Sequence, residues 1–261
     1  MRRPFAAIFG ILLLLTVSAA VLLLAGRSQQ QRIAILTGFD REAAEVAGLI
    51  DAARTEKILI GEIVFGSLAG REVLLVSVGP GMTNAAARTQ ALLDRYPVSL
   101  VIVVGTAGGL SDDLEVGDVV IPASWRSHQY GQITPEGFTP FPLSVQPFRQ
   151  HETVPVAEFA VDAASLALAG RLPDVRVGGL GLSGDVFVSD PAARDRLRGE
   201  FGGLIVDMES AAVAQTAYLN GVPFIVIRGI SDLAGGASIG DPGLAFTRPA
   251  QATRDLIALL P

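Results

Sequence analysis

The segment SLVIVVG, residues 99–105, constrains the fold of this chain more than any other stretch of its sequence. A strand with one face in water alternates apolar and polar residues, whereas the middle of this segment is apolar without interruption. Such a strand must be covered on both faces, as in a sheet that lies between two layers of helices. The sequence therefore indicates an α/β architecture with a buried central sheet.

The segments on either side alternate between strand-like and helix-like patterns. In the first half we expect a buried strand at 32–38, a helix at 40–56, two strands joined by a turn within 58–79, and a helix at 83–96. In the second half we expect strands at 116–122, 175–182 and 223–229, helices around 158–170 and after Asp207, a C-terminal helix at 250–260, and a proline-rich excursion without clear periodicity at 123–157. This order predicts a three-layer α/β sandwich in which a mixed, mostly buried central sheet is flanked by helices. Half of the residues are hydrophobic, which is enough for one large core, and we assign residues 29–261 to one domain.

The N-terminus differs from the rest of the chain. Residues 4–26 carry no charge, and they are preceded by Arg2 and Arg3. About 20 apolar residues suffice to cross the ~30 Å hydrocarbon layer of a bilayer, and the paired arginines favour a cytoplasmic N-terminus. We therefore predict that residues 1–28 are either a cleaved signal peptide or a retained membrane anchor. In both cases the domain is exported, to the periplasm or to the outer side of the inner membrane.

Composition and motifs disfavour several classes of function. The chain has no cysteine and two histidines, which excludes thiol catalysis and leaves too few ligands for a zinc site. Its net charge is −6 and it has no basic run, so we expect no nucleic-acid partner. A formal G-x-G-x-x-G at 179–184 is followed by strand-like residues, not by the helix of a dinucleotide site, and no G-x-S-x-G of a serine hydrolase occurs.

The remaining signals lie where predicted strands end. VDMESAAVAQ (206–215) places Asp207 and Glu209 in a run that is otherwise apolar or small, and an isolated buried carboxylate is costly. Glycines or acids also follow other predicted strands, in TGFDREAAEV (37–46), GTAGGL (105–110), SGDVF (183–187) and VIRGISDLA (226–234). Ligands of open α/β sheets gather at the carboxyl ends of strands, so we expect these segments to form one site.

Taken together and in order, GTAGGL, VGDVV, SGDVF, VDMESAAVA and VIRGISDLA resemble the motifs of the purine nucleoside phosphorylase / uridine phosphorylase superfamily. The resemblance is closest to its methylthioadenosine/S-adenosylhomocysteine nucleosidase branch, and it covers roughly residues 32–121 and 177–260. It implies a nucleoside phosphorylase-like sandwich. It also implies hydrolysis of the N-glycosidic bond of a purine nucleoside, with no metal and no cofactor.

The resemblance implies a role for each acid. Asp232 faces the purine and donates a proton near its N7, and general acid help of this kind is worth ~10²–10⁴ in rate. Glu42 orients and deprotonates the attacking water. Glu209 accepts hydrogen bonds from the ribose 2′- and 3′-hydroxyls. Asp207 is left as a helix cap.

The other matching residues surround these acids. Met208 packs against the sugar, and the backbone of Val188 reads the edge of the base. Phe187 either stacks on the base or belongs to the core. Three more residues complete the predicted site: Arg228 and Thr106 near the attacking water, and Ser231 beside the acid.

Water is the expected nucleophile, because three acids in the first loop would repel a phosphate dianion and Arg41 is the only basic residue there. Two alternatives stay open: a phosphate-dependent nucleoside phosphorylase, and a non-catalytic nucleoside-binding or storage protein on the same fold. The presence of both Glu42 and Asp232 favours an enzyme. The resemblance further implies a homodimer, and the 5′-substituent of the nucleoside is left open.

Overall fold

The computed structural model describes residues 31–58, 61–235, 241 and 243–261, and residues Arg32–Pro261 fold around one sheet. The predicted signal peptide or anchor, residues 1–28, lies outside the described residues. Among the helices that the structure describes, none is long and apolar enough to cross a bilayer.

Within the described residues, twelve strands join in one sheet. The sheet is mixed, which confirms the prediction. Along its main path the strands follow the order β12 (Phe159–Ala160), β7 (Ser124–Ser127), β14 (Leu180–Ser183), β15 (Gly203–Asp207), β5 (Val98–Gly109), β1 (Arg32–Thr37), β4 (Arg71–Ser77), β3 (Gly61–Leu68) and β2 (Asp51–Ile58). β16 (Phe224–Asp232) pairs with β5 and with β6 (Val119–Ile121), which also pairs with β13 (Val175–Val177). β5 runs parallel to β1 and β16 and antiparallel to β15, so it lies at the centre of the sheet.

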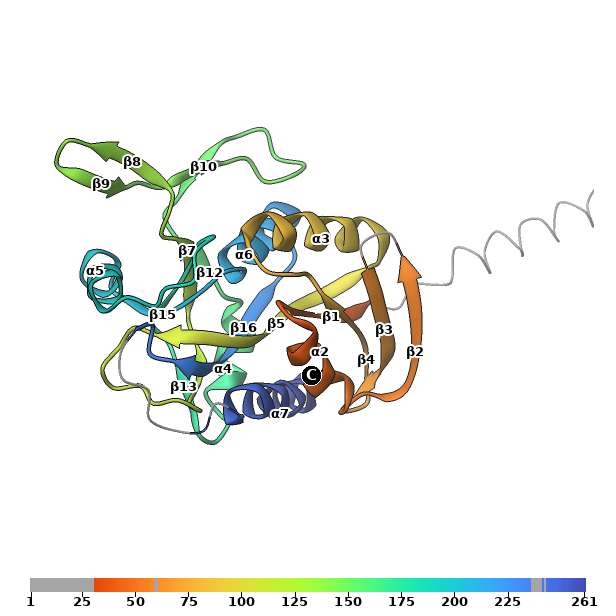
Figure 1. Cartoon of the computed structure of the whole chain (residues 1–261). Coiled ribbons are helices and arrows are strands. Elements are labelled where there is room, and N and C mark those ends of the chain that lie inside the picture. Colours follow the sequence, from red (N-terminus) through yellow and green to blue (C-terminus); the bar gives the residue numbers. More distant parts are fainter. Residues whose placement is uncertain (1–30, 59–60, 236–240, 242) are drawn as a thin grey trace, which may run out of the picture. The chain divides into compact units, whose positions relative to one another are not determined.

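Helices cover both faces of this sheet (Figure 1). α3 (Met82–Arg95) and α6 (Ser210–Asn220) pack together on one face, whereas α2 (Asp40–Ala47), α4 (Ala163–Ala169) and α7 (Leu244–Leu259) lie on the other. α5 (Pro191–Phe201) packs beside β15. Val101 and Ile102 of β5 have no exposed surface, which confirms that this strand is buried on both faces.

The helix predicted at 40–56 is wrong in its second half. α2 ends at Ala47, where Gly48 donates its N–H to the carbonyl of Ala44, and residues Asp51–Ile58 form β2. β2 pairs antiparallel with β3 at the edge of the sheet. Alanine, glutamate and lysine are good helix formers, but helix propensity is a small energy per residue, so pairing with a neighbouring strand can override it.

Two other regions also differ from the prediction. The single strand predicted at 175–182 is divided into β13 and β14, because Gly178 and Gly179 have φ angles of 107° and 80° and turn the chain between them. The excursion at 123–157 contains β7 of the main sheet and two small antiparallel pairs, β8 (Gly131–Thr134) with β9 (Gly137–Pro140) and β10 (Leu143–Val145) with β11 (Val154–Val156). These short strands lack the apolar alternation of a half-buried strand, so the pattern did not reveal them.

β5 is longer than predicted and runs through the glycine-rich GTAGG segment. Its partner β16 is parallel to it, with Arg228 opposite Gly105, Gly229 opposite Thr106 and Asp232 opposite Gly108. This register places the ends of two motifs that are more than 100 residues apart in the chain side by side.

Candidate active site

The predicted site residues lie at the carboxyl ends of β1, β5, β14, β15 and β16 and on the segments that follow these strands. Glu42 lies in the first turn of α2, just after β1, and Glu209 lies between β15 and α6. A methyl group added at Gly38 would come within 3.2 Å of the Glu209 carboxyl carbon, and Gly38 also donates its N–H to Glu42. The end of β1 therefore separates the two carboxylates.

Glu42 is enclosed by hydrogen-bond donors. Its side chain is buried, with 2% of its surface exposed. Oε2 accepts the backbone N–H groups of Gly38 at 2.9 Å and Phe39 at 3.2 Å. Oε1 accepts the backbone N–H of Thr106 at 2.7 Å and its hydroxyl at 3.0 Å. The protein thus satisfies this buried carboxylate from the loop after β1 and from the end of β5.

Glu209 is equally buried but has fewer donors. Oε1 accepts the backbone N–H of Gly81 at 3.0 Å, and Oε2 lies 3.4 Å from Nη2 of Arg228. Burial raises the pKa of Glu209 to about 7; the nearby charge of Arg228 and the Gly81 N–H oppose this rise, and the charges of Asp207 and Glu42 add to it. Near neutral pH the side chain therefore exists in both protonation states.

Asp207 forms an ion pair that the sequence did not predict. Its Oδ2 lies 2.7 Å from Nη2 of Arg228, and both side chains are almost fully buried. Its Oδ1 accepts the backbone N–H groups of Glu209 at 3.2 Å and Ser210 at 3.1 Å, which is the capping role expected for it. The hydroxyls of Ser183 and Ser210 donate to the same carboxylate. Asp207 thus fixes both the start of α6 and the position of Arg228.

Arg228 lies between the two glutamates. Its guanidinium is fully buried, and its Nε and Nη1 have no hydrogen-bond partner among the described residues. A methyl group added at Gly105 would overlap both this guanidinium and the Glu42 carboxylate, so the two groups flank the same point of β5. A buried N–H without a partner is costly, and a water or substrate oxygen beside Glu42 would satisfy it.

Asp232 ends β16 and is half-buried. Its Oδ1 accepts the backbone N–H of Ala234 at 2.8 Å, and its Oδ2 accepts the hydroxyl of Ser231 at 2.9 Å. A methyl group at Gly108 would come within 3.1 Å of Oδ1. Ser231 therefore orients the predicted acid.

Asp232 faces a small cavity between the SGDVF segment and β15. The cavity is lined by Gly108, Val186, Phe187, Val188, Val206, Asp207, Met208 and Asp232. Its volume of about 30 Å³ holds one or two waters but not a purine. Phe187 is 70% exposed, which excludes the core alternative, whereas Val188 is buried.

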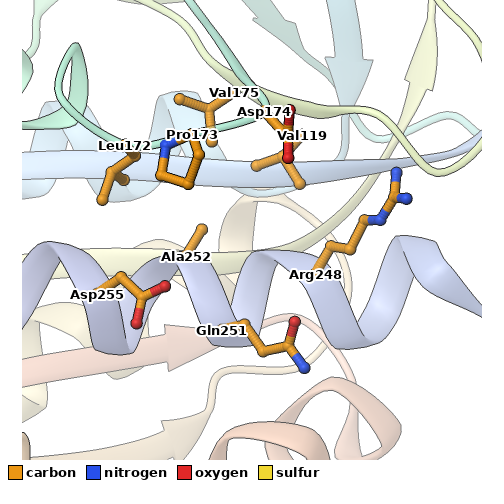
Figure 2. A pocket seen from close by; sticks show the side chains of 9 residues that line it. All are labelled: Val119, Leu172, Pro173, Asp174, Val175, Arg248, Gln251, Ala252 and Asp255. Carbon is orange, nitrogen blue, oxygen red and sulfur yellow. The ribbon is translucent and has the colours of Figure 1, made fainter.

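A larger pocket lies elsewhere and contains none of the predicted site residues (Figure 2). It has a volume of about 190 Å³ and lies between α7, the start of β6 and the segment that leads into β13. Its polar side chains are Asp174, Arg248, Gln251 and Asp255. It lies away from the carboxyl ends of the central strands, so volume alone does not identify the site.

One contributor to the site, Gly81, was missed among the candidate residues. The sequence VGPG (78–81) leaves β4 and enters α3, and its last residue supplies the N–H that holds Glu209. The glycine-rich turn was visible in the sequence as a strand end followed by a helix. Its partner, 128 residues away, was not.

Comparisons with known proteins agree on one family. The family model described as "Phosphorylase superfamily" matches residues 32–257. A 5′-methylthioadenosine/S-adenosylhomocysteine nucleosidase of Bacillus thuringiensis (strain Al Hakam) is 36% identical over 219 residues, covering 78% of this chain and 87% of the relative.

Solved structures show the same fold. The 5′-methylthioadenosine/S-adenosylhomocysteine nucleosidase of Neisseria meningitidis, in complex with methylthio-immucillin-A, is similar with a TM-score of 0.75 and 28% identity, over 88% of this chain and 100% of the other. The Streptococcus pneumoniae nucleosidase in complex with 8-aminoadenine has the same TM-score, identity and coverage. Futalosine hydrolase of Helicobacter pylori, at 23% identity and a TM-score of 0.73 over 88% of this chain and 99% of the other, shares the fold.

Proposed function

The chain belongs to the phosphorylase superfamily, and from this premise we propose that it hydrolyses the N-glycosidic bond of a purine nucleoside. The products are the free base and the sugar. Its relatives are named 5′-methylthioadenosine/S-adenosylhomocysteine nucleosidases, so these two nucleosides are the first substrates to test.

The surroundings of Glu42 favour water over phosphate as the nucleophile. Three backbone N–H groups and one hydroxyl converge at the ends of β1 and β5, which is the kind of donor cluster that binds an oxyanion. In this chain the Glu42 carboxylate accepts all four donors. A phosphate dianion would have to displace this carboxylate and would be repelled by it, whereas a neutral water would not.

Water is activated beside Glu42. The hydroxyl of Thr106 is the one donor of the four that can rotate away, and its rotation leaves a lone pair of Oε1 free to accept a water proton. Nη1 of Arg228, which has no hydrogen-bond partner within the described part of the chain, lies at the same point of β5 and can hold the water oxygen. During attack the water oxygen bonds to the anomeric carbon of the sugar and its proton passes to Glu42.

The other two acids bind the ribose and the departing base. Glu209 accepts the ribose hydroxyls with the capacity that Gly81 and Arg228 leave unused. Asp232 protonates N7 of the departing purine, and the bond between the sugar and the base breaks. Phe187, exposed beside the cavity that Asp232 faces, stacks on the base.

The test is release of free base by the purified chain. Methylthioadenosine, S-adenosylhomocysteine, adenosine, inosine and uridine are incubated with it, with and without inorganic phosphate. We expect adenine from the first two substrates at the same rate in both conditions, together with the free sugar. Release that requires phosphate and yields a sugar phosphate would show a phosphorylase. Tight binding with no release, unchanged in Asp232→Asn, would show a storage protein.

Export and dimerisation are separate proposals. The uncharged stretch at 4–26 supports a domain outside the cytoplasm, and the family resemblance supports a homodimer. Cell fractionation with a C-terminal epitope, and light scattering of the purified protein, would test them.

A further inference from the structure

The SGD motif, Ser183–Asp185, ends β14 and connects three parts of the site. Ser183 is buried; it donates to Asp207 and accepts the N–H of Ala211 at 2.8 Å. Asp185 is exposed, and its backbone N–H donates to Oε1 of Gln129 at 2.8 Å. The motif thus anchors the segment that carries Phe187 to α6 on one side and to the segment after β7 on the other.

The carboxylate of Asp185 reaches a third element. Its Oδ1 accepts the backbone N–H of Met82 at 2.7 Å, and a methyl group at Gly81 would lie 3.0 Å from it. Met82 begins α3, whose N-cap residue is glycine and supplies no side-chain cap, and no acid lies in its first turn. Asp185 therefore caps α3 from a position 103 residues away.

Two adjacent N–H groups consequently hold two carboxylates of the site. Gly81 donates to Glu209, the predicted ribose ligand, and Met82 donates to Asp185, two residues before the base-stacking Phe187. A shift of the turn before α3 would move both hydrogen bonds together. The ribose contact and the base-stacking segment are thereby joined through one turn.

We infer that Asp185 is a positioning residue that couples the base half of the site to the ribose half. The inference rests on the proposed function for the identity of the ligand, but the tether itself is independent of catalysis. Coupling between two half-sites is reciprocal, so losing the tether weakens binding of the base and binding of the ribose alike.

The experiment compares Asp185→Ala with Asp185→Asn and with Asp113→Ala, which removes an exposed aspartate on the segment after β5. The asparagine keeps an oxygen that can accept from Met82. Hydrogen exchange measured without ligand should speed up in residues 81–84 and 184–188 in Asp185→Ala only. Calorimetry, carried out with Asp232→Asn added to each protein so that the nucleoside is not cleaved, should show about tenfold weaker binding of both adenine and methylthioadenosine in Asp185→Ala, with binding restored in Asp185→Asn. The KM should rise by the same factor with kcat within about twofold.

A double variant with Glu209→Gln adds a test of coupling. We expect the losses of nucleoside affinity in Asp185→Ala and Glu209→Gln to be less than additive, because both act through the turn at residues 81–82. Additive losses of affinity in the double variant would overturn the inference. Hydrogen-exchange rates and affinities of Asp185→Ala equal to those of Asp113→Ala would overturn it as well. Faster exchange with unchanged affinities would also overturn it. Failure of the wild-type chain to release any base would overturn the proposed function alone, since exchange and adenine binding would still test the tether.

Discussion

Two buried glutamates lie on opposite sides of Gly38, and their surroundings differ. On the water side, which we define as Gly38, Glu42 and Thr106, the carboxylate accepts four hydrogen bonds. The ribose side is defined as Gly81, Met208 and Glu209. Here the Glu209 carboxylate accepts one backbone N–H, from Gly81 at 3.0 Å, and lies 3.4 Å from one guanidinium nitrogen of Arg228.

The difference is the one expected from the roles proposed for Glu42 and Glu209. The water side is satisfied by the protein, so its geometry is set before substrate arrives, as a general base requires. On the ribose side the Glu209 carboxylate can accept further hydrogen bonds. Burial with so few donors raises the pKa of Glu209 to about 7. A ligand with two hydroxyl donors would supply what the ribose side lacks.

The largest expected effect comes from Arg228→Met, because this arginine lies between the two sides. The variant leaves Asp207 and Glu209 as buried charges without a cationic partner. We expect a loss of about 3–5 kcal/mol in the free energy of unfolding, measured by urea denaturation. Adding Asp207→Asn to this variant should recover part of the loss; no recovery would mean that the ion pair is not what stabilises this region.

Glu42→Gln removes the proposed general base from the water side and leaves the ribose side unchanged. In either orientation the amide nitrogen would face at least one backbone N–H donor, and the amide cannot accept a proton, so we expect kcat to fall about 10³-fold. The control is Glu45→Gln on the same helix, which should retain its activity. A kcat within tenfold of wild type in Glu42→Gln would assign the general base to another residue.

Glu209→Gln tests the ribose side through pH. The pKa of Glu209 in the folded state lies above its ordinary value of 4.5, so the folded chain binds more protons than the unfolded chain between these two pH values. Wild-type stability should therefore fall as pH rises from 4.5 to about 7, by up to about 3 kcal/mol, and then level off. Glu209→Gln should lack this fall. Parallel profiles of the free energy of unfolding for the two proteins would show that burial does not raise this pKa.

Phe187→Ala should give the smallest effect and leave both carboxylates unchanged. Stacking of a base on an aromatic ring is worth about 1–3 kcal/mol, so the KM for the nucleoside should rise about tenfold or more. Since Phe187 is 70% exposed, thermal melting should be unaffected. Phe148→Ala, at another exposed phenylalanine, is the matched control and should not change KM.

Much of the fold followed from local patterns. The unbroken apolar run in β5 and the alternation of strands and helices correctly predicted a mixed α/β sandwich. The strand ends rich in glycine and acids correctly predicted that the motifs contact one another. The helix predicted across 51–56 was wrong, because an edge strand depends on a partner strand that local propensity does not reveal. The short strands at 124–156 were missed because they lack the apolar alternation of a half-buried strand.

The sequence by itself determined which residue types follow each strand, because alternating apolar segments and glycine turns are local properties of the chain. Only the tertiary structure decided how each buried charge is satisfied. Gly81, Thr106 and Arg228 reach their carboxylate partners across long separations in the chain. A carboxylate's role depends on how many donors surround it, and that number is set by strand order and register rather than by the residue itself.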